Sequence, residues 1–372
     1  MNDNIVSYVL SLFDAAPTPL LVFLIFGVAI FLLVNVMALI GGLGTYAERK
    51  ISADIQMRQG PNRVGPYGIL QFLADGVKMI TKEDIIPSES NKFLFTIAPI
   101  LCLSGVLASL AVVPVSSGFI LTDLNVGIFY LLGVSSLVGV GIFLGGYASN
   151  SKWSMLGGMR GASQIISYEV PVTISILTIV LLAGSLSFKE LIAGQGGHPW
   201  TWYLFHNPFT FISFFIYFVS ALAETNRAPF DLPEAESELV SGYHTEYTGM
   251  RFAFFALAEY IEVFVVCGVA VALFLGGYKV PFGLGGDTIF GQFFQIGSFF
   301  TKTFLLYYVV IWIRWTLPRL RVDQLMSICW KYLTPIALFN LVGTATWIWL
   351  FDNKSMVDLL LSALSGSGSA GH

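Results

Sequence analysis

Residues 19–44 read PLLVFLIFGVAIFLLVNVMALIGGLG, a stretch in which no side chain is ionisable. A helix needs roughly 20 consecutive apolar residues to cross the hydrocarbon core of a bilayer, and this stretch is longer. Across the 372 residues, hydrophobic side chains make up 55% and charged side chains only 11%. That balance is typical of membrane proteins and argues against a soluble domain of the same length.

Similar apolar stretches recur along the chain, so we expect an all-α polytopic membrane protein with about eight transmembrane helices. The expected spans lie near 19–44, 94–115, 126–148, 165–186, 208–224, 252–276, 297–315 and 333–352. We treat residues 1–354 as a single transmembrane domain and 355–372 as a C-terminal tail. No internal repeat is visible, which weakens an interpretation as a transporter built from inverted halves.

The basic residues are distributed unevenly between the two sets of loops. The first, third, fifth and seventh loops hold 15 of the 19 Lys and Arg residues. Lys189, Lys279, Lys302 and Lys354 are left for the other side. Because cytoplasmic loops are enriched in basic residues, we expect the odd-numbered loops to face the cytoplasm and both termini to face outward.

The first loop is long enough to hold structure of its own. Gly65-Pro66 predicts a helix start, and apolar and polar residues then separate on two helical faces. The apolar face holds Ile69, Leu70, Leu73, Val77 and Ile80, and the polar face holds Gln71, Asp75, Lys78 and Lys82. This pattern indicates an amphipathic helix lying on the membrane surface.

Three carboxylates, Glu169, Glu224 and Glu259, lie within or at the end of expected spans. A charged group costs about 2.5–3.5 kcal/mol at the bilayer centre on insertion scales, so each needs a partner or an interior pathway. They are candidate proton carriers, because burial and neighbouring acids can bring a carboxyl pKa towards neutral pH. Glu236, Glu238 and Glu246 could extend such a path into the fifth loop, and Glu262 would share the face of Glu259.

These acids have an alternative explanation in ordinary structural roles. Glu169 and Glu259 could bond locally while protonated, or pair with Arg160, Arg227 or Arg251. Asp231 could cap a helix that begins at Pro233, with Glu234 at capping-box spacing.

Charged residues also gather where the first span ends and at the edges of neighbouring loops. They are Glu48, Arg49, Lys50, Arg58, Arg63, Arg160 and Arg251. Singly, such residues anchor helices at the membrane surface. Together, beside a surface helix, they would suit the mouth of a site for a ligand with a polar head and a lipid tail. The cysteines and histidines show no spacing typical of a metal, haem or iron-sulfur site, and no nucleotide-binding motif is present.

Several longer motifs are recognisable in order along the chain. The first is Arg58-Gln59-Gly60-Pro61-Asn62-Arg63-Val64-Gly65-Pro66, followed by Ala74-Asp75-Gly76-Val77-Lys78 and Lys82-Glu83-Asp84. Later come Ser167-Tyr168-Glu169-Val170-Pro171, the stretch 223–247 and Ala258-Glu259-Tyr260. Across roughly residues 40 to 335, the chain closely resembles the H-subunit family of bacterial respiratory complex I, the counterpart of mitochondrial subunit one.

The resemblance implies the membrane subunit of a proton-translocating NADH:quinone oxidoreductase in a bacterial inner membrane. It implies that the chain forms the membrane part of a quinone chamber, with quinone, either ubiquinone or menaquinone, as substrate. No redox centre is expected in this chain itself. The expected chamber residues are Glu48, Arg49, Arg63, Asp75 and Arg251. The expected acidic proton path holds Glu169, Glu224, Glu236, Glu238, Glu246 and Glu259.

The resemblance also implies partners. Peripheral subunits, one with the terminal iron-sulfur cluster, would contact the odd-numbered loops, where we expect Arg58, Arg160, Arg227 and Asp231. Other partners would be further membrane-arm subunits and the lipid bilayer, and no nucleic acid is expected. A related membrane subunit of an energy-converting hydrogenase is an alternative, and an autonomous proton-coupled transporter is a second. Two features depart from the family pattern: Ser135-Ser136 stands where some members carry a Glu, and Glu262 lies outside the known motif.

Overall fold

Long apolar helices account for most of the chain that the structure covers. The computed structural model describes residues 19–281, 286, 288–351, 354–357 and 359. Within these residues, seven helices are long and apolar enough to cross a membrane, and an eighth apolar helix is shorter. The expected all-α polytopic membrane fold is confirmed. The N-terminal segment and most of the expected tail at 355–372 lie outside the described residues.

The helices overlap the expected spans, but some bounds differ: α6 begins earlier than expected and α4 ends earlier. The long apolar helices are α2 (Pro19–Ile55), α4 (Lys92–Leu110), α5 (Gly127–Ala148), α6 (Lys152–Ala183), α8 (Pro208–Glu224), α10 (Gly249–Phe274) and α11 (Ile289–Thr316). The last is a composite of α12 (Val322–Ser327), a π-helical turn η6 (Ile328–Leu333) and α13 (Thr334–Phe351). Short elements between them are η1 (Pro66–Gly68), α3 (Gln71–Thr81), α7 (Phe188–Ala193), η2 (Pro199–Thr201), η3 (Tyr203–Phe205), α9 (Glu236–Leu239) and η4 (Gly242–His244).

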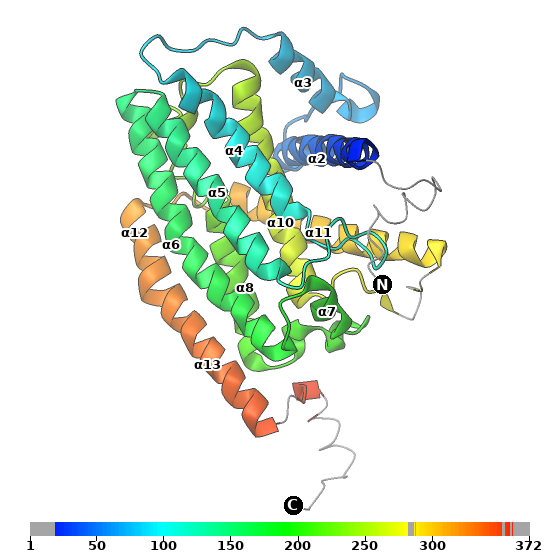
Figure 1. Cartoon of the computed structure of the whole chain (residues 1–372). Coiled ribbons are helices and arrows are strands. Elements are labelled where there is room, and N and C mark those ends of the chain that lie inside the picture. The colour runs from blue at the N-terminus through cyan, green and yellow to red at the C-terminus, as the bar shows by residue number, and fades with distance from the viewer. Residues whose placement is uncertain (1–18, 282–285, 287, 352–353, 358, 360–372) are drawn as a thin grey trace, which may run out of the picture.

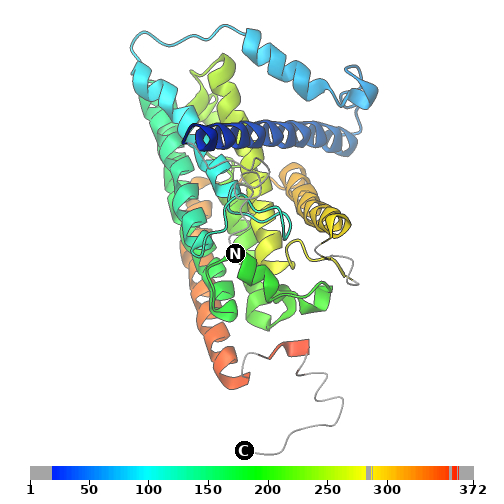
Figure 2. The ribbon, with the colours of Figure 1, turned by 45° about the vertical axis from the view of Figure 1, so that its right-hand side comes forward.

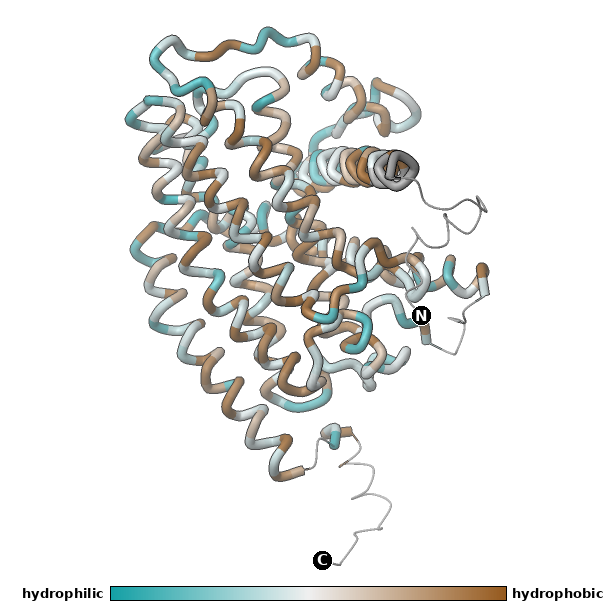
Figure 3. Tube along the Cα trace, in the orientation of Figure 1, coloured by the Kyte–Doolittle hydropathy of each residue, from teal (hydrophilic) through white to brown (hydrophobic). Residues whose placement is uncertain are grey.

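The helices α4, α5, α6 and α13 run side by side, whereas α2 and α11 cross the bundle steeply (Figures 1 and 2). Of the most apolar window of α10, 78% is buried, compared with 22% in α2 and 28% in α11. Helix α10 is therefore the central helix, and the outer helices expose apolar side chains where lipid would lie. Figure 3 shows that hydrophobic residues are frequent along the helices and hydrophilic residues in the connecting turns.

The odd-numbered loops meet at one end of the bundle, which we call the basic end. Hydrogen bonds join them in the pairs Asn91–Ala148, Ser154–Tyr243 and Leu320–Pro229. At the other end, which we call the opposite end, the Lys302 ammonium donates to the carbonyl of Leu275. The grouping of loops that the basic residues predict therefore exists in the fold.

Small residues let α5 pack closely against its neighbours. A Cβ atom added at Gly146 would lie 2.9 Å from the Cα of Gly158 on α6, and one added at Gly141 would lie 3.0 Å from the backbone nitrogen of Cys102 on α4. Close approach of backbones at small residues is how membrane helices gain packing energy in an apolar solvent.

The surface helix begins later than expected. Tyr67 and Gly68 have positive φ values of 56° and 80°, which lie outside the α-helical region, so α3 starts at Gln71. The predicted start at Gly65-Pro66 is therefore wrong, because those residues form only a short 3₁₀ turn. Phe72 of α3 packs against Gly42 of α2, while Leu73 and Val77 are exposed.

Candidate functional site

A buried carboxylate lies between two arginines at the basic end. Glu48 of α2 is only 4% exposed. One of its oxygens lies 2.8 Å from Nη1 of Arg227, and the other is paired with Arg314 of α11. The Arg227 guanidinium also lies 4.0 Å above the ring centre of Tyr260 on α10. Tyr307 of α11 interacts with both Arg227 and Glu48. We call Glu48, Arg227, Arg314, Tyr260 and Tyr307 the Glu48 cluster.

The Glu48 cluster exists because the helices continue beyond the apolar stretches. Helix α2 does not end at Gly44 but carries Glu48 to a position facing α10 and the loop after α8. Burial disfavours the charged form of Arg227, but the adjacent Glu48 carboxylate outweighs burial and holds the pKa of Arg227 above its usual range. Arg227 therefore stays a cation.

The Glu48 cluster has spare hydrogen-bond donors. Within the described part of the chain, Nε and Nη2 of Arg227 are buried without a partner, and so is the hydroxyl of Tyr307. Buried polar groups are normally bonded to protein, water or ligand. The Glu48 cluster can thus donate hydrogen bonds to a polar ligand or to water.

A second group of polar residues connects the fifth loop to α10. Tyr243 donates a hydrogen bond of 2.8 Å to Glu259, and His244 lies 3.0 Å from Glu234. Burial raises the pKa of Glu234, but hydrogen bonds with His244 and Glu259 outweigh burial and hold it at about 2. Glu234 is therefore an anion at neutral pH.

Asp231 has the opposite character. Burial and the charge of Glu234 raise the pKa of Asp231 to about 6, although Arg319 lies 3.3 Å away and favours the carboxylate. The capping interpretation of this segment is wrong, because the helix here is α9 (Glu236–Leu239) with Ala235 as its N-cap.

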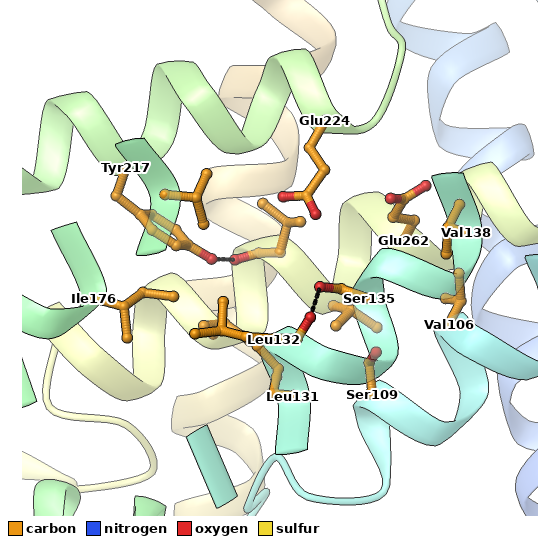
Figure 4. Close-up of a pocket in the computed structure, with 14 residues that line it drawn as sticks. Val106, Ser109, Leu131, Leu132, Ser135, Val138, Ile176, Tyr217, Glu224 and Glu262 are labelled. Atoms are coloured by element: carbon orange, nitrogen blue, oxygen red, sulfur yellow. Dashed lines mark hydrogen bonds between the residues drawn. The ribbon is translucent and has the colours of Figure 1, made fainter. Parts of the chain in front are cut away.

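A third group lies deeper in the bundle, around a cavity of about 40 Å³. Glu224 at the end of α8 and Glu262 of α10 line this cavity together with Ser109, Ser135 and Tyr217 (Figure 4). The charge of Glu169 on α6 reaches Glu224. The expected acids Glu169 and Glu224 are thus brought together.

Electrostatic contacts link the three groups into a series. Arg227 interacts with Glu259 as well as with Glu48, and Glu262 interacts with both Arg227 and Glu224. The series begins at the basic end with Glu48 and continues to Glu169 among the apolar helices. Such an arrangement can carry a change of charge or a proton between neighbouring carboxyl groups.

The other expected residues lie nearer the surface. Arg49 is half-exposed and paired with Asp75 of α3, which ties α3 to α2. Arg251 is paired with Asp84 at 3.0 Å, and Arg63 is exposed. Arg251 therefore lies outside the Glu48 cluster.

The residues expected at partner contacts or at the loop end of the path are distributed as follows. Arg58 is exposed and donates to Gln56. Arg160 and Glu238 form an ion pair of 2.7 Å, with Glu238 56% exposed. Glu246 is half-buried between η4 and α10. Glu236 opens α9, and its side chain lies outside what the structure describes.

Arg227, which we expect at a contact with a peripheral subunit, lies inside the fold of this chain. The side chain is 3% exposed because the Glu48 carboxylate and the Tyr260 ring hold it inside.

The sequence interpretation missed Arg314, His244 and Tyr260. One signal was present: Arg314 falls within the expected span at 297–315, and an ionisable residue inside a span is a candidate functional residue. The partnership of His244 with Glu234 had no signal, because residues ten positions apart in an irregular loop have no fixed geometry.

Comparisons with known proteins identify the family of the chain. A sequence model of the family described as NADH dehydrogenase matches residues 28–345, a range that contains every residue of the three groups. The chain is 49% identical over 317 residues to the H subunit of NADH-quinone oxidoreductase from Chlorobaculum parvum, covering 82% of this chain and 87% of that protein. It is 46% identical over 332 residues to the corresponding H subunit from Anaeromyxobacter dehalogenans, covering 85% and 80%. It is 45% identical over 333 residues to NADH-quinone oxidoreductase subunit 8 of Rhodothermus marinus, covering 87% and 96%.

Proposed function

This chain belongs to the NADH dehydrogenase family as a membrane subunit of an NADH-quinone oxidoreductase, and on that premise we propose that it forms the membrane wall of the quinone chamber and the start of a proton path. The names of the relatives favour this function over the hydrogenase-type alternative. The other subunits of the complex are its partners.

The chamber wall is formed by the Glu48 cluster and the residues around it. A quinone headgroup presents carbonyl oxygens, and the Glu48 cluster offers buried donors on Arg227 and Tyr307. Arg49, Arg63, Asp75 and Arg251 stand at the mouth, between α3 and the start of α10. The apolar tail, of ubiquinone or menaquinone alike, enters beside the exposed apolar face of α3.

The proton path begins where the Glu48 cluster meets the fifth loop. Glu259, Glu224 and Glu169 carry the proton inward, and Glu234 joins them as a fixed anion. Glu236, Glu238 and Glu246 connect the path to the basic end. The electron chemistry belongs to the quinone and to the iron-sulfur cluster of a peripheral subunit, and this chain supplies positions, hydrogen bonds and charges.

The remaining contacts follow from exposure. Arg58 and the Arg160–Glu238 pair lie at the basic end, where we place the peripheral subunits. Asp231, paired with Arg319, lies beside them. The basic end faces the cytoplasm of a bacterial cell, since it holds most of the Lys and Arg residues.

The observation that carries this proposal is the burial of Glu48 between Arg227 and Arg314 beside unsatisfied donors. Its test is Glu48→Gln in the assembled complex. Because the carboxylate sets the position and charge of Arg227, we expect quinone reduction to fall at least about tenfold, while NADH oxidation by a water-soluble artificial acceptor is retained.

The artificial acceptor is the control for the redox centres, because it needs only the peripheral subunits, and assembly is checked by the subunit content of the purified complex. Glu190→Gln, at an exposed position of α7 at the opposite end, is the matched control for removal of a carboxylate and should behave as the unmodified protein. Unchanged quinone reduction in Glu48→Gln would show that the Glu48 cluster is not part of the quinone chamber.

A further inference from the structure

The cavity that holds Glu224 and Glu262 lies where α4, α5, α6, α8 and α10 meet. Its walls are mostly apolar, formed by residues such as Val106, Leu131 and Val269. In Figure 4, Glu224 points into the space below α8, with Ser135 and Ser109 from α5 and α4 across from it. A polar ligand of this cavity would contact side chains from five membrane helices.

Both carboxylates are buried and without a bonded partner. Glu224 is 6% exposed and Glu262 is 7% exposed. In the described part of the chain, neither side chain makes a hydrogen bond or ion pair within the protein, and both line the cavity. Since a buried polar group without a partner costs free energy, these two groups indicate a ligand that bonds to both.

The hydroxyl groups on the wall are oriented to accept further hydrogen bonds. Ser109 donates to the Gly105 carbonyl at 2.9 Å, and Ser135 donates to the Leu132 carbonyl at 3.0 Å. Tyr217 donates to the Val266 carbonyl at 3.1 Å. Each hydroxyl has thus used its hydrogen and retains lone pairs, so the ligand must be a donor.

Water fits both the chemistry and the size. A buried water needs roughly 10–15 Å³ of such space, so a cavity of about 40 Å³ holds two or three waters. Water donates to hydroxyl oxygens and carboxylates and accepts from a protonated carboxyl. The charged groups within range are Arg227 and Glu169. Two carboxylates facing one apolar cavity cannot both remain ionised, so the pair holds a proton.

We propose that this cavity binds water and that the water shares one proton between Glu224 and Glu262, which makes Glu262 a proton carrier of the complex. This inference rests on the proposed proton path, because it extends that path from Glu224 to a residue outside the expected series. In each transfer the O–H bond of one protonated carboxyl breaks as a water accepts its proton. That water, or the next, gives a proton to the other carboxylate, and no electron moves.

The test is Glu262→Gln in the whole complex, in vesicles. The amide is isosteric but cannot release a proton, so we expect proton pumping and coupled quinone reduction to fall about tenfold, with assembly retained. Infrared difference spectra on reduction should lose a protonated carboxyl band. Glu190→Gln is again the matched control, with unchanged pumping and spectrum.

A structural role for Glu262 is distinguished by moving the carboxyl across the cavity. Ser135→Glu added to Glu262→Gln should restore much of the pumping, because the new acid faces the same water from α5. No recovery from this second substitution would overturn the inference. If Glu262→Gln prevents assembly, the density map of the unmodified complex decides: water in the cavity supports the inference, and a dry cavity overturns it.

Failure of this inference differs from failure of the proposed function. Normal pumping in Glu262→Gln with defective pumping in Glu224→Gln would show that Glu262 is not a proton carrier. The proposed path through Glu224 would still stand. Normal pumping in both would overturn the path itself.

Discussion

Asp231 and Glu234 show how strongly the surroundings decide the behaviour of one residue type. They lie three positions apart, yet burial and a neighbouring anion raise the pKa of Asp231 to about 6, whereas hydrogen bonds from His244 and Glu259 hold Glu234 at about 2. The sequence shows two acids in a polar loop, but it does not show that His244 and Glu259 bond to Glu234 while Asp231 faces the charge of Glu234.

The pKa of Asp231 predicts a pH dependence of stability. Because its pKa is about 6 in the folded chain against an ordinary 3.8, the folded state binds the proton more tightly than the unfolded state. Its contribution to stability is therefore full below about pH 4 and is lost as the pH rises to about 6. In Asp231→Asn, the thermal inactivation midpoint of the solubilised complex should vary less over this range.

Glu234→Gln tests the opposite case, a carboxyl group whose pKa is lowered in the folded chain. A lowered pKa contributes stability above the ordinary value of 4.5, and that contribution is lost only as the pH falls towards 2. This variant should therefore be less stable at neutral pH. An Asp231→Asn profile parallel to that of the unmodified protein would contradict the assignment.

Among the elements, the helix interiors were predictable, and the ends were predictable for α8 but not for α2. Hydropathy is a local property, so each expected span overlaps a long helix. The polar residues after Gly44 suggest a loop, yet α2 continues to Ile55, because Ala47, Glu48 and Arg49 all suit a helix. This extension brings Glu48 to Arg227, so the error in the helix end hid the centre of the site.

Helix α3 carries a prediction of its own. Its residues Leu73, Val77 and Ile80 are exposed, while Phe72 and Asp75 hold it to α2. Val77→Lys puts a charge on the face that we place against lipid, which should weaken docking of α3 at the membrane. We expect a several-fold higher half-saturating concentration for a long-tailed quinone.

The control for α3 is Lys78→Gln, which changes a neighbouring residue on the polar face. It should leave the half-saturating concentration unchanged, and a short-tailed quinone should respond less to Val77→Lys than a long-tailed one. Equal effects of both substitutions would mean that the apolar face of α3 does not guide the tail.

For the whole molecule, the sequence established the class and the grouping of the loops. The acids Glu169, Glu224 and Glu259 were found because a charge inside an apolar helix is conspicuous. Their order could not be read, because it depends on which helices pack around α10. Glu262 gains a role only because α5 and α8 enclose the same cavity.

The orientation of the chain can be measured with added cysteines. Cys102, Cys267 and Cys329 are buried, so the background labelling by a membrane-impermeant maleimide should be low. Lys189→Cys, at the opposite end, should react in spheroplasts, where the outer face of the inner membrane is accessible. Lys152→Cys, at the basic end, should react only in inverted vesicles. The reverse pattern would place the basic end outside.

The position of Arg227 couples quinone binding to the protonation of neighbouring acids. This guanidinium is paired with Glu48 and interacts electrostatically with Glu259 and Glu262. Thermodynamic linkage is reciprocal, so whatever a quinone headgroup does to the proton affinity of these acids, protons on the acids do to the affinity for quinone by the same factor. A large membrane potential that keeps the acids protonated would then weaken quinone binding beside Arg227. Quinone reduction would slow for this reason, without any leak of protons.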